Sequence, residues 1–340
     1  MRIVGIFCIM YKCNGLLGIN DERIKMKIRN IVVALIFVVT MREISIGAGE
    51  EIDLRLKFVI GEKYLYSSEF TQKVTQYIHE EDQTILLKIE IDQLEEISNI
   101  DSSGNYLIEI IYDRIHVKQT YGQISSEYDS RDHNQYVDPA MRSFAWMVGK
   151  KFQILLNPKG EVLEIIGADA LIDSIIAVMD IPESPQRESV INDIKGRFGA
   201  AALKQSIEQT TDYFPVGPVQ VGNSWETESV LNYGFSMKFV SQYTLISVAD
   251  GIGTISDSSL VTSVPEYSRL DFGDISSEYQ ISGTRTGMIK VDLDTGLAIE
   301  IESSSQFSGT MSISSETSGT NQTWPIRAEG QAKISFARRN

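Results

Sequence analysis

Most of the chain after residue 50 alternates hydrophobic and polar positions with a period of two. Ile85, Leu87, Ile89 and Ile91 share one parity, and Lys88 and Glu90 stand between them. Residues 106–112 and 235–245 repeat the pattern. Alternation of this kind is typical of a strand that buries one face. The pattern therefore predicts a mainly β, antiparallel protein.

The spacing changes in the middle of the chain. Leu171, Ile175 and Val178 lie three or four residues apart, and a second hydrophobic stripe follows over residues 190–207. This is the spacing of a helix with one buried face. The pattern predicts a helical bridge over residues 168–214, between an N-terminal β half (49–167) and a C-terminal β half (215–340).

Three short segments of the first half recur in the same order in the second. Residues 60–64 are echoed by 221–225, residues 122–128 by 273–279, and residues 156–160 by 292–296. Ordered echoes of this kind indicate an internal duplication. We expect an α+β fold of two related, curved antiparallel sheets or half-barrels joined by the helical bridge. One continuous β-barrel or sandwich is the alternative.

The first 48 residues have the pattern of an export signal. Lys27 and Arg29 precede a hydrophobic run from Ile31 to Met41, and small residues around Ala48 follow. The run is shorter than the roughly 20 residues that cross a bilayer, but it fits a signal peptide. We expect a signal peptide at 26–48, an upstream mis-start at 1–25, and a mature protein without a membrane span. A buried N-terminal strand is the alternative.

The positions of the cysteines and the net charge limit which cellular compartments and which partners we expect. Cys8 and Cys13 both precede the expected cleavage site, so the mature chain would have neither disulfides nor cysteine zinc ligands. Export without disulfides suits the periplasm or the surface of a bacterium. A net charge of −15 disfavours nucleic acid as a partner.

The residues that usually carry catalysis do not occur in recognisable patterns. His79, His116 and His133 have no metal-ligand spacing, and His133 with Asp129 and Asp132 is the best candidate for acid–base or metal chemistry. The turn at 292–296 is only a fragment of a calcium loop. We therefore expect no catalytic residues, metal or cofactor.

Aromatic residues remain as candidates for binding. They would line the concave side of curved sheets and could contact a hydrophobic ligand there, whereas the alternative is an ordinary core. The candidates are Tyr64, Trp146, Trp225, Phe239 and Tyr243, with Phe144 and Phe235 beside them.

Two segments resemble an uncharacterised family of exported bacterial proteins. One is Phe214 to Glu226, with a Val-Gly-x-x-Trp motif, and the other is Leu54 to Tyr64, with a Gly-x-x-Tyr motif. The resemblance implies export and a domain of unknown function, without catalytic residues. We expect a non-catalytic envelope protein that binds a hydrophobic molecule or a partner protein. The alternatives are a hydrolase that uses carboxylates or a histidine, and a structural surface protein.

Overall fold

The computed structural model describes most of the chain from residue 50 onward. The described residues are 50–78, 81–138, 141–179, 199–231, 236–272, 275–315 and 319–339, with residues 181, 183, 187, 188, 191, 192 and 195 between them. The expected mis-start and signal peptide, both cysteines, His79 and Phe235 lie outside these residues.

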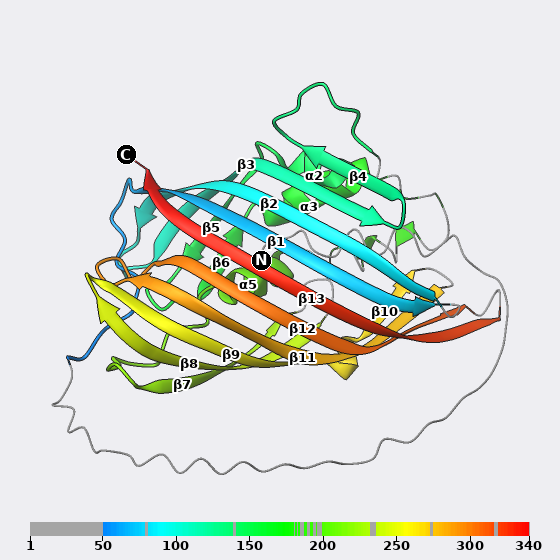
Figure 1. Cartoon of the computed structure of the whole chain (residues 1–340). Coiled ribbons are helices and arrows are strands. Elements are labelled where there is room, and N and C mark those ends of the chain that lie inside the picture. Colours follow the sequence, from blue (N-terminus) through cyan, green and yellow to red (C-terminus); the bar gives the residue numbers. More distant parts are fainter. Residues whose placement is uncertain are drawn as a thin grey trace, which may run out of the picture.

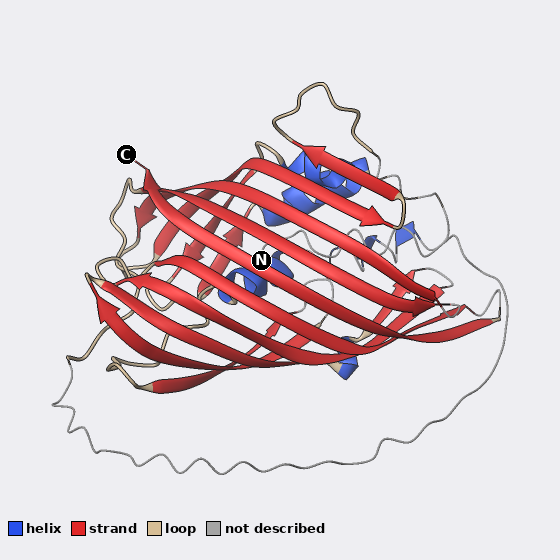
Figure 2. Ribbon diagram, viewed as in Figure 1, coloured by secondary structure: helices blue, strands red, loops and turns tan. Residues whose placement is uncertain are grey.

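A single antiparallel sheet of 13 strands dominates the structure (Figures 1 and 2). The period-two alternation is the cause, since it gives each strand one face to bury. The strands are β1 (Lys63–Ile78), β2 (Glu81–Ile100), β3 (Tyr106–Tyr121), β4 (Ile124–Asp129), β5 (Lys151–Leu156), β6 (Val162–Ile166), β7 (Ser224–Leu231), β8 (Met237–Ala249), β9 (Ile252–Ser263), β10 (Arg269–Phe272), β11 (Ile275–Asp292), β12 (Ala298–Ser315) and β13 (Thr320–Arg339).

The two halves meet in this one sheet. The strand order is β6-β5-β3-β2-β1-β13-β12-β11-β9-β8-β7, with β4 paired to β3 and β10 paired to β11. β1 pairs with β13 continuously, from Lys63 opposite Arg339 to Gln76 opposite Ile326. The expectation of two sheets is therefore wrong. The expectation of one closed barrel is also wrong, because β6 and β7 end the path without pairing to each other among the described residues.

Each half follows the same course through the sheet. The order β1-β2-β3-β5-β6 in the first half parallels β7-β8-β9-β11-β12 in the second. Two of the three echoes fall at matching steps, and the first is a glycine turn: Gly61 and Gly222, with φ of 86° and 91°, precede the first strand of each half. The echo of residues 122–128 does not, because it begins β4, which lies off this path, whereas its counterpart begins β11. The other matching echo forms the β5–β6 turn at residues 157–160 and the β11–β12 turn at residues 292–296. The duplication that the echoes indicate stays a prediction.

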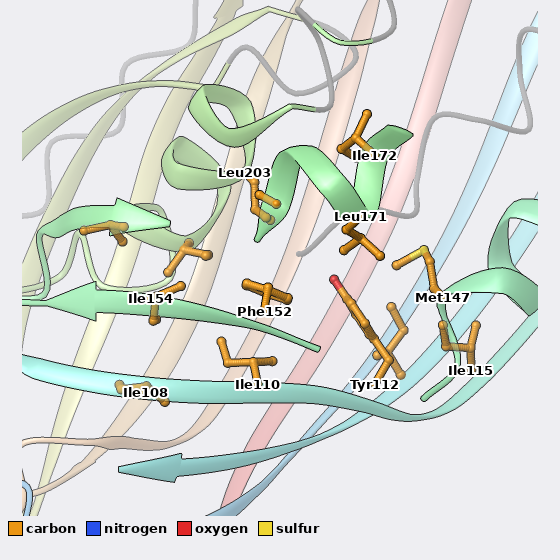
Figure 3. Close-up of a cluster of buried hydrophobic side chains, with 14 of the residues drawn as sticks. Ile108, Ile110, Tyr112, Ile115, Met147, Phe152, Ile154, Leu171, Ile172 and Leu203 are labelled. Atoms are coloured by element: carbon orange, nitrogen blue, oxygen red, sulfur yellow. The ribbon is translucent and has the colours of Figure 1, made fainter. Parts of the chain in front are cut away.

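The helices lie on the inner side of the curved sheet (Figure 1). They are α2 (Arg142–Met147), α3 (Ala168–Val178) and α5 (Ala200–Glu208), with a short 3-10 turn, η3 (Pro265–Tyr267). α3 and α5 fall in the expected bridge, but they pack inside one sheet and do not join two. Figure 3 shows Leu171 of α3 and Leu203 of α5 above Phe152 of β5.

Hydrophobic residues fill the inner side of the first half. Ile110, Tyr112 and Phe152 are at most 2% exposed and contact α2, α3 and α5 through one cluster. The outer side carries ion pairs such as Lys63–Glu96 (3.1 Å) and Lys333–Glu302 (2.6 Å). Burial of one face and hydration of the other is what the alternation predicts.

Residues 50–58 and the chain after α5 connect the two ends of the sheet. The amide of Leu56 donates to Pro158 O, and the amide of Lys57 donates to Thr295 O, so this segment joins the β5–β6 turn to the β11–β12 turn. The Glu208 carboxylate accepts from the amide of Val162 on β6. Through these contacts α5 and its flanks stabilise a sheet whose edges do not pair.

Candidate functional site

A row of polar and small residues crosses the inner face of the second half. The pairing register places its members side by side on successive strands from β7 to β1. On one side lies a hydrophobic row through Phe239 and Val261. On the other side lies a row through Tyr243 and Asp257, and beyond it a hydrophobic row through Leu245, Ile255 and Ile289. The polar row consists of Thr227, Ser241, Ser259, Arg285, Ser305, Gly330 and Gln72.

Arg285 lies at the centre of this row and organises a buried cluster of charges. Its Nε lies 2.9 Å from Asp257 Oδ2 of β9, and its Nη2 donates to Tyr243 Oη of β8 at 3.4 Å. The Phe239 ring centroid lies 5.3 Å from the guanidinium carbon. Ser259 donates to Asp257 Oδ1 at 2.8 Å. We call Asp212, Tyr243, Asp257 and Arg285 the Arg285 cluster.

Asp212 completes the cluster from the segment after α5. Tyr243 donates to Asp212 Oδ1 at 2.5 Å. Burial raises the pKa of Asp212 to about 6, although Arg285 and the Tyr243 hydrogen bond oppose the shift. Two buried acids therefore share one cation. Asp257 makes the close ion pair with Arg285, and Asp212, which does not, is the acid whose pKa is raised toward neutral pH.

Asp212 and the inner face of β7 carry buried polar atoms without hydrogen-bond partners. Among the described residues, Asp212 Oδ2 and the hydroxyls of Thr227 and Ser229 make no hydrogen bond of ordinary geometry. Ser229 still lies close enough to Asp212 to lower its pKa. Such unpaired groups are uncommon in folded proteins and usually mark ordered water or a functional role.

The inner face of β11, β12, β13 and β1 carries small residues that stay partly exposed. We call this surface the inner strip; its members are Gly283, Gly287, Ser303, Ser305, Phe307, Ala328, Ala332, Ser68, Phe70 and Gln72. A side chain added at Gly283 would collide with Phe307, and one added at Gly330 would lie near Phe70. The two phenyl rings therefore lie over glycines of the neighbouring strands and remain partly exposed.

Three of the five predicted aromatic residues lie at the Arg285 cluster. Trp225 stacks on Tyr243 with ring centroids 6.0 Å apart, and its indole nitrogen donates to Tyr213 O. Phe239 contacts Arg285, as described above. These three were predicted as ligand contacts, and that role stays a prediction.

Tyr64 and Trp146 lie elsewhere. Tyr64 is 4% exposed, packs against Phe58 and donates to Glu62 at 2.9 Å, near the end of the sheet. Trp146 of α2 is 38% exposed, and the ammonium of Lys150 lies 4.1 Å from its ring centroid. Phe144, on the same helix, is a buried core residue. The structure does not bring these residues to the Arg285 cluster.

Asp212, Asp257 and Arg285 were not among the site residues predicted from the sequence. A signal for two of them was present, since Arg285 shares the parity of Ile289 and Asp257 shares that of Ile255. A charged residue at a buried parity needs a partner, and each of these two provides one for the other. Asp212 has no such signal, because it lies outside any strand.

The two described histidines lie apart from the Arg285 cluster. His133 is exposed in the loop after β4, and no group of three or more His, Cys, Asp or Glu residues suited to a metal ion occurs in the described part of the chain. His116 lies on the outer side, with Nδ1 2.5 Å from Glu90 and Nε2 3.0 Å from Glu127.

His116 is expected to make stability depend on pH. Burial alone would lower the pKa of His116, but the hydrogen bonds with Glu90 and Glu127 outweigh it and raise the pKa. A raised folded-state pKa stabilises the protein below the unfolded value of about 6.5, and the gain is lost as pH rises through the folded value. His116→Gln should therefore lose stability more at pH 5.5 than at pH 8.5, by less than about 1 kcal/mol. Urea unfolding at the two pH values measures this, and an equal loss at both would contradict it.

The outer face of the central strands has two adjacent hollows of about 560 and 660 Å³. Thr71, Ser304 and Gln331 line both. Lysines and glutamates surround them, and several are already paired with each other, as in Lys88–Glu69 and Lys333–Glu302. Because several of these outer charges already pair with each other, the Arg285 cluster on the inner face is the better candidate for a functional site.

The family comparison covers the region that holds this chemistry. The model of DUF6263, a family of unknown function, matches residues 103–298, more than half of the chain. The chain belongs to this family. The DUF6263 match includes all four residues of the Arg285 cluster and the turn at residues 292–296. The expected membership of an uncharacterised family is thus confirmed.

Other comparisons describe the chain only loosely. No curated protein sequence matches it. A structure of lipid–protein interactions in lipovitellin is similar with a TM-score of 0.40 and 9% identity, over 83% of this chain and 25% of the other. OccK7 of Pseudomonas aeruginosa is similar with a TM-score of 0.20 and 7% identity, over 83% of this chain and 100% of the OccK7 chain. An outer membrane channel of Pseudomonas putida F1 is similar with a TM-score of 0.21 and 5% identity, over 83% of this chain and 98% of the channel chain. These similarities carry no functional argument.

No helix among the described residues is long and apolar enough to cross a membrane.

Proposed function

We propose that this chain is an exported, non-catalytic protein of the bacterial cell envelope that binds a hydrophobic or amphiphilic molecule. The ligand would lie against the inner strip. The observation that carries the proposal is the partial exposure of Phe70 and Phe307 on the inner side of the sheet, where they border the hydrophobic core and lie among Gly, Ala and Ser residues.

The contrast between the two parts of the inner face supports this proposal. In the first half, α2, α3 and α5 cover residues such as Ile110 and Phe152, which are at most 2% exposed. Within the inner strip most members are Gly, Ala or Ser, and its residues stay partly exposed. Apolar surface gains free energy when it leaves water, so a hydrophobic ligand would bind to it favourably.

Export is proposed from the sequence. The hydrophobic run from Ile31 to Met41 fits a signal peptide, and both cysteines precede Ala48. The non-catalytic part of the proposal follows from the surroundings of the candidate residues. His116 is engaged by two carboxylates on the outer side, and His133 lies in an exposed loop. The Arg285 cluster holds two acids but pairs them with a cation.

Native mass spectrometry of protein recovered from an envelope fraction tests the proposal. We expect a discrete mass above that of residues 49–340, which organic extraction removes. The extracted protein should then bind the neutral fluorescent probe N-phenyl-1-naphthylamine. If the observed mass is that of the protein alone and the extracted protein does not bind the probe, the proposal is overturned. Co-purification of a specific protein instead would favour the partner-binding alternative.

A pair of variants locates the binding surface. Phe307→Glu places a carboxylate on the inner strip and should weaken probe binding at least tenfold, because the charge must be desolvated on binding. Ser308→Glu introduces the same charge at the next residue, on the outer face of the same strand, and should leave binding unchanged. Equal effects of the two variants would place the probe elsewhere.

A further inference from the structure

A charged side chain, Arg285, lies on β11 between Gly283 and Gly287 of the inner strip. Along the inner face of β11, β12, β13 and β1, the charged residues among those described are Arg285 and, at the rim, Arg338. Arg338 pairs with Glu62 at 2.8 Å. Among the described residues of these four strands, Arg285 is therefore the charged group without a rim position that a molecule on the inner strip would meet. Asp257 lies opposite Gly287 on β9, but its side chain is only 5% exposed.

The positive end of the cluster is its accessible end. The Arg285 side chain is 18% exposed, whereas the Asp257 side chain is 5% exposed. A guanidinium has five N–H donors, more than Asp257 Oδ2 and Tyr243 Oη can accept from it. Ser305 lies directly opposite Arg285 on β12, partly exposed, and offers a further hydroxyl donor.

We propose that Arg285 binds the carboxylate head of a single-chain amphiphile whose alkyl chain lies along the inner strip. The proposal rests on the function proposed above and names its ligand class. The four strands from β11 to β1 stand about 4.8 Å apart, so the strip crosses a distance of roughly 15 Å. Phe70 and Phe307 offer apolar contact along it.

The charge balance favours a single negative charge on the head group. Arg285 already faces Asp257, and Asp212 lies behind Tyr243. Burial raises the pKa of Asp212 to about 6, so this acid can take up a proton when a further anion approaches. A phosphate monoester carries close to two charges at neutral pH and would exceed what one guanidinium balances. A carboxylate brings one charge and matches the guanidinium in geometry.

Competition among amphiphiles with one chain length and different heads tests the proposal on the wild-type protein. N-phenyl-1-naphthylamine reports displacement by dodecanoate, dodecanol, dodecyl phosphate and dodecyltrimethylammonium, each below its micelle concentration at pH 7.5. We expect dodecanoate to displace the probe at a concentration at least tenfold lower than the other three, as a charge-assisted hydrogen bond implies.

A double variant assigns the preference to Arg285. Arg285→Met with Asp257→Leu removes both charges of the buried pair, leaves the net charge unchanged, and avoids a buried carboxylate without a partner. Its preference for dodecanoate over dodecanol should fall to within about twofold. Arg327→Met, on the exposed outer face of β13, should keep the wild-type preference.

The outcomes separate this proposal from the one on which it rests. Equal displacement by dodecanoate and dodecanol, or a preference that survives in the double variant, would overturn the carboxylate site while leaving hydrophobic binding intact. Stronger displacement by dodecyl phosphate or by dodecyltrimethylammonium would do the same. If the probe does not bind the delipidated wild-type protein, both proposals fail.

Discussion

Replacing Arg285 by alanine is expected to lower the free energy of unfolding by about 3–5 kcal/mol. The change removes the cation 2.9 Å from Asp257 and leaves that carboxylate buried without its partner. It also removes the charge that lowers the pKa of Asp212, so a second acid loses favourable interaction. Urea unfolding monitored by circular dichroism measures the effect.

Arg327 provides the control for this prediction. It lies on the exposed outer face of β13, and Arg327→Ala should change the free energy of unfolding by no more than about 0.5 kcal/mol. An Arg285→Ala protein that unfolds at the wild-type urea midpoint would show that the cluster does not stabilise the fold. The double variant Arg285→Met with Asp257→Leu should be more stable than Arg285→Ala alone, since it leaves no buried carboxylate at position 257 without a partner.

Truncation of Phe152 is the second change with a large expected effect. Phe152→Ala should lower the free energy of unfolding by about 3–5 kcal/mol, through lost burial and the cavity left behind. Phe152 is 2% exposed, lies 6.0 Å from the Tyr112 ring, and faces α3 and α5 across the core of the first half (Figure 3). Thermal or urea unfolding checks the prediction.

The neighbouring edge strand supplies a matched control. Leu163 of β6 is 46% exposed, so Leu163→Ala should cost less than about 1 kcal/mol. A similar loss for both variants would mean that burial in the helix-covered core does not govern stability. A small loss for Phe152→Ala alone would mean that the helices collapse into the space that the ring vacates.

The predicted binding residues show what the alternation along a strand can predict and what it cannot. Trp225, Phe239 and Tyr243 were singled out as aromatic residues facing the concave side, and they do lie together on the inner face of β7 and β8. Tyr64 has the same parity signal but lies near the end of the sheet, where it donates to Glu62. Parity indicates the face of a residue and does not give its neighbours on other strands.

The charged partners of these aromatic residues required the pairing register. Asp257 and Arg285 are 28 positions apart and meet because β9 pairs with β11. Asp212 reaches Tyr243 from a connecting segment that has no periodic pattern. Long-range neighbours of this kind follow from tertiary structure, since a local pattern carries no information about distant strands.

The strands, the helical middle and the family of this protein could be inferred from the sequence alone. Its period-two alternation specifies which face of each strand is buried, and the glycines at 61 and 222 specify matching turns. That the halves share one open sheet follows from strand pairing, because β1 pairs with β13 near the two ends of the described chain. Strand pairing also decides that one buried arginine faces the inner strip. The physical reason is that hydrophobic pattern is a local property, whereas strand order and charge pairing arise from contacts between residues far apart in the chain.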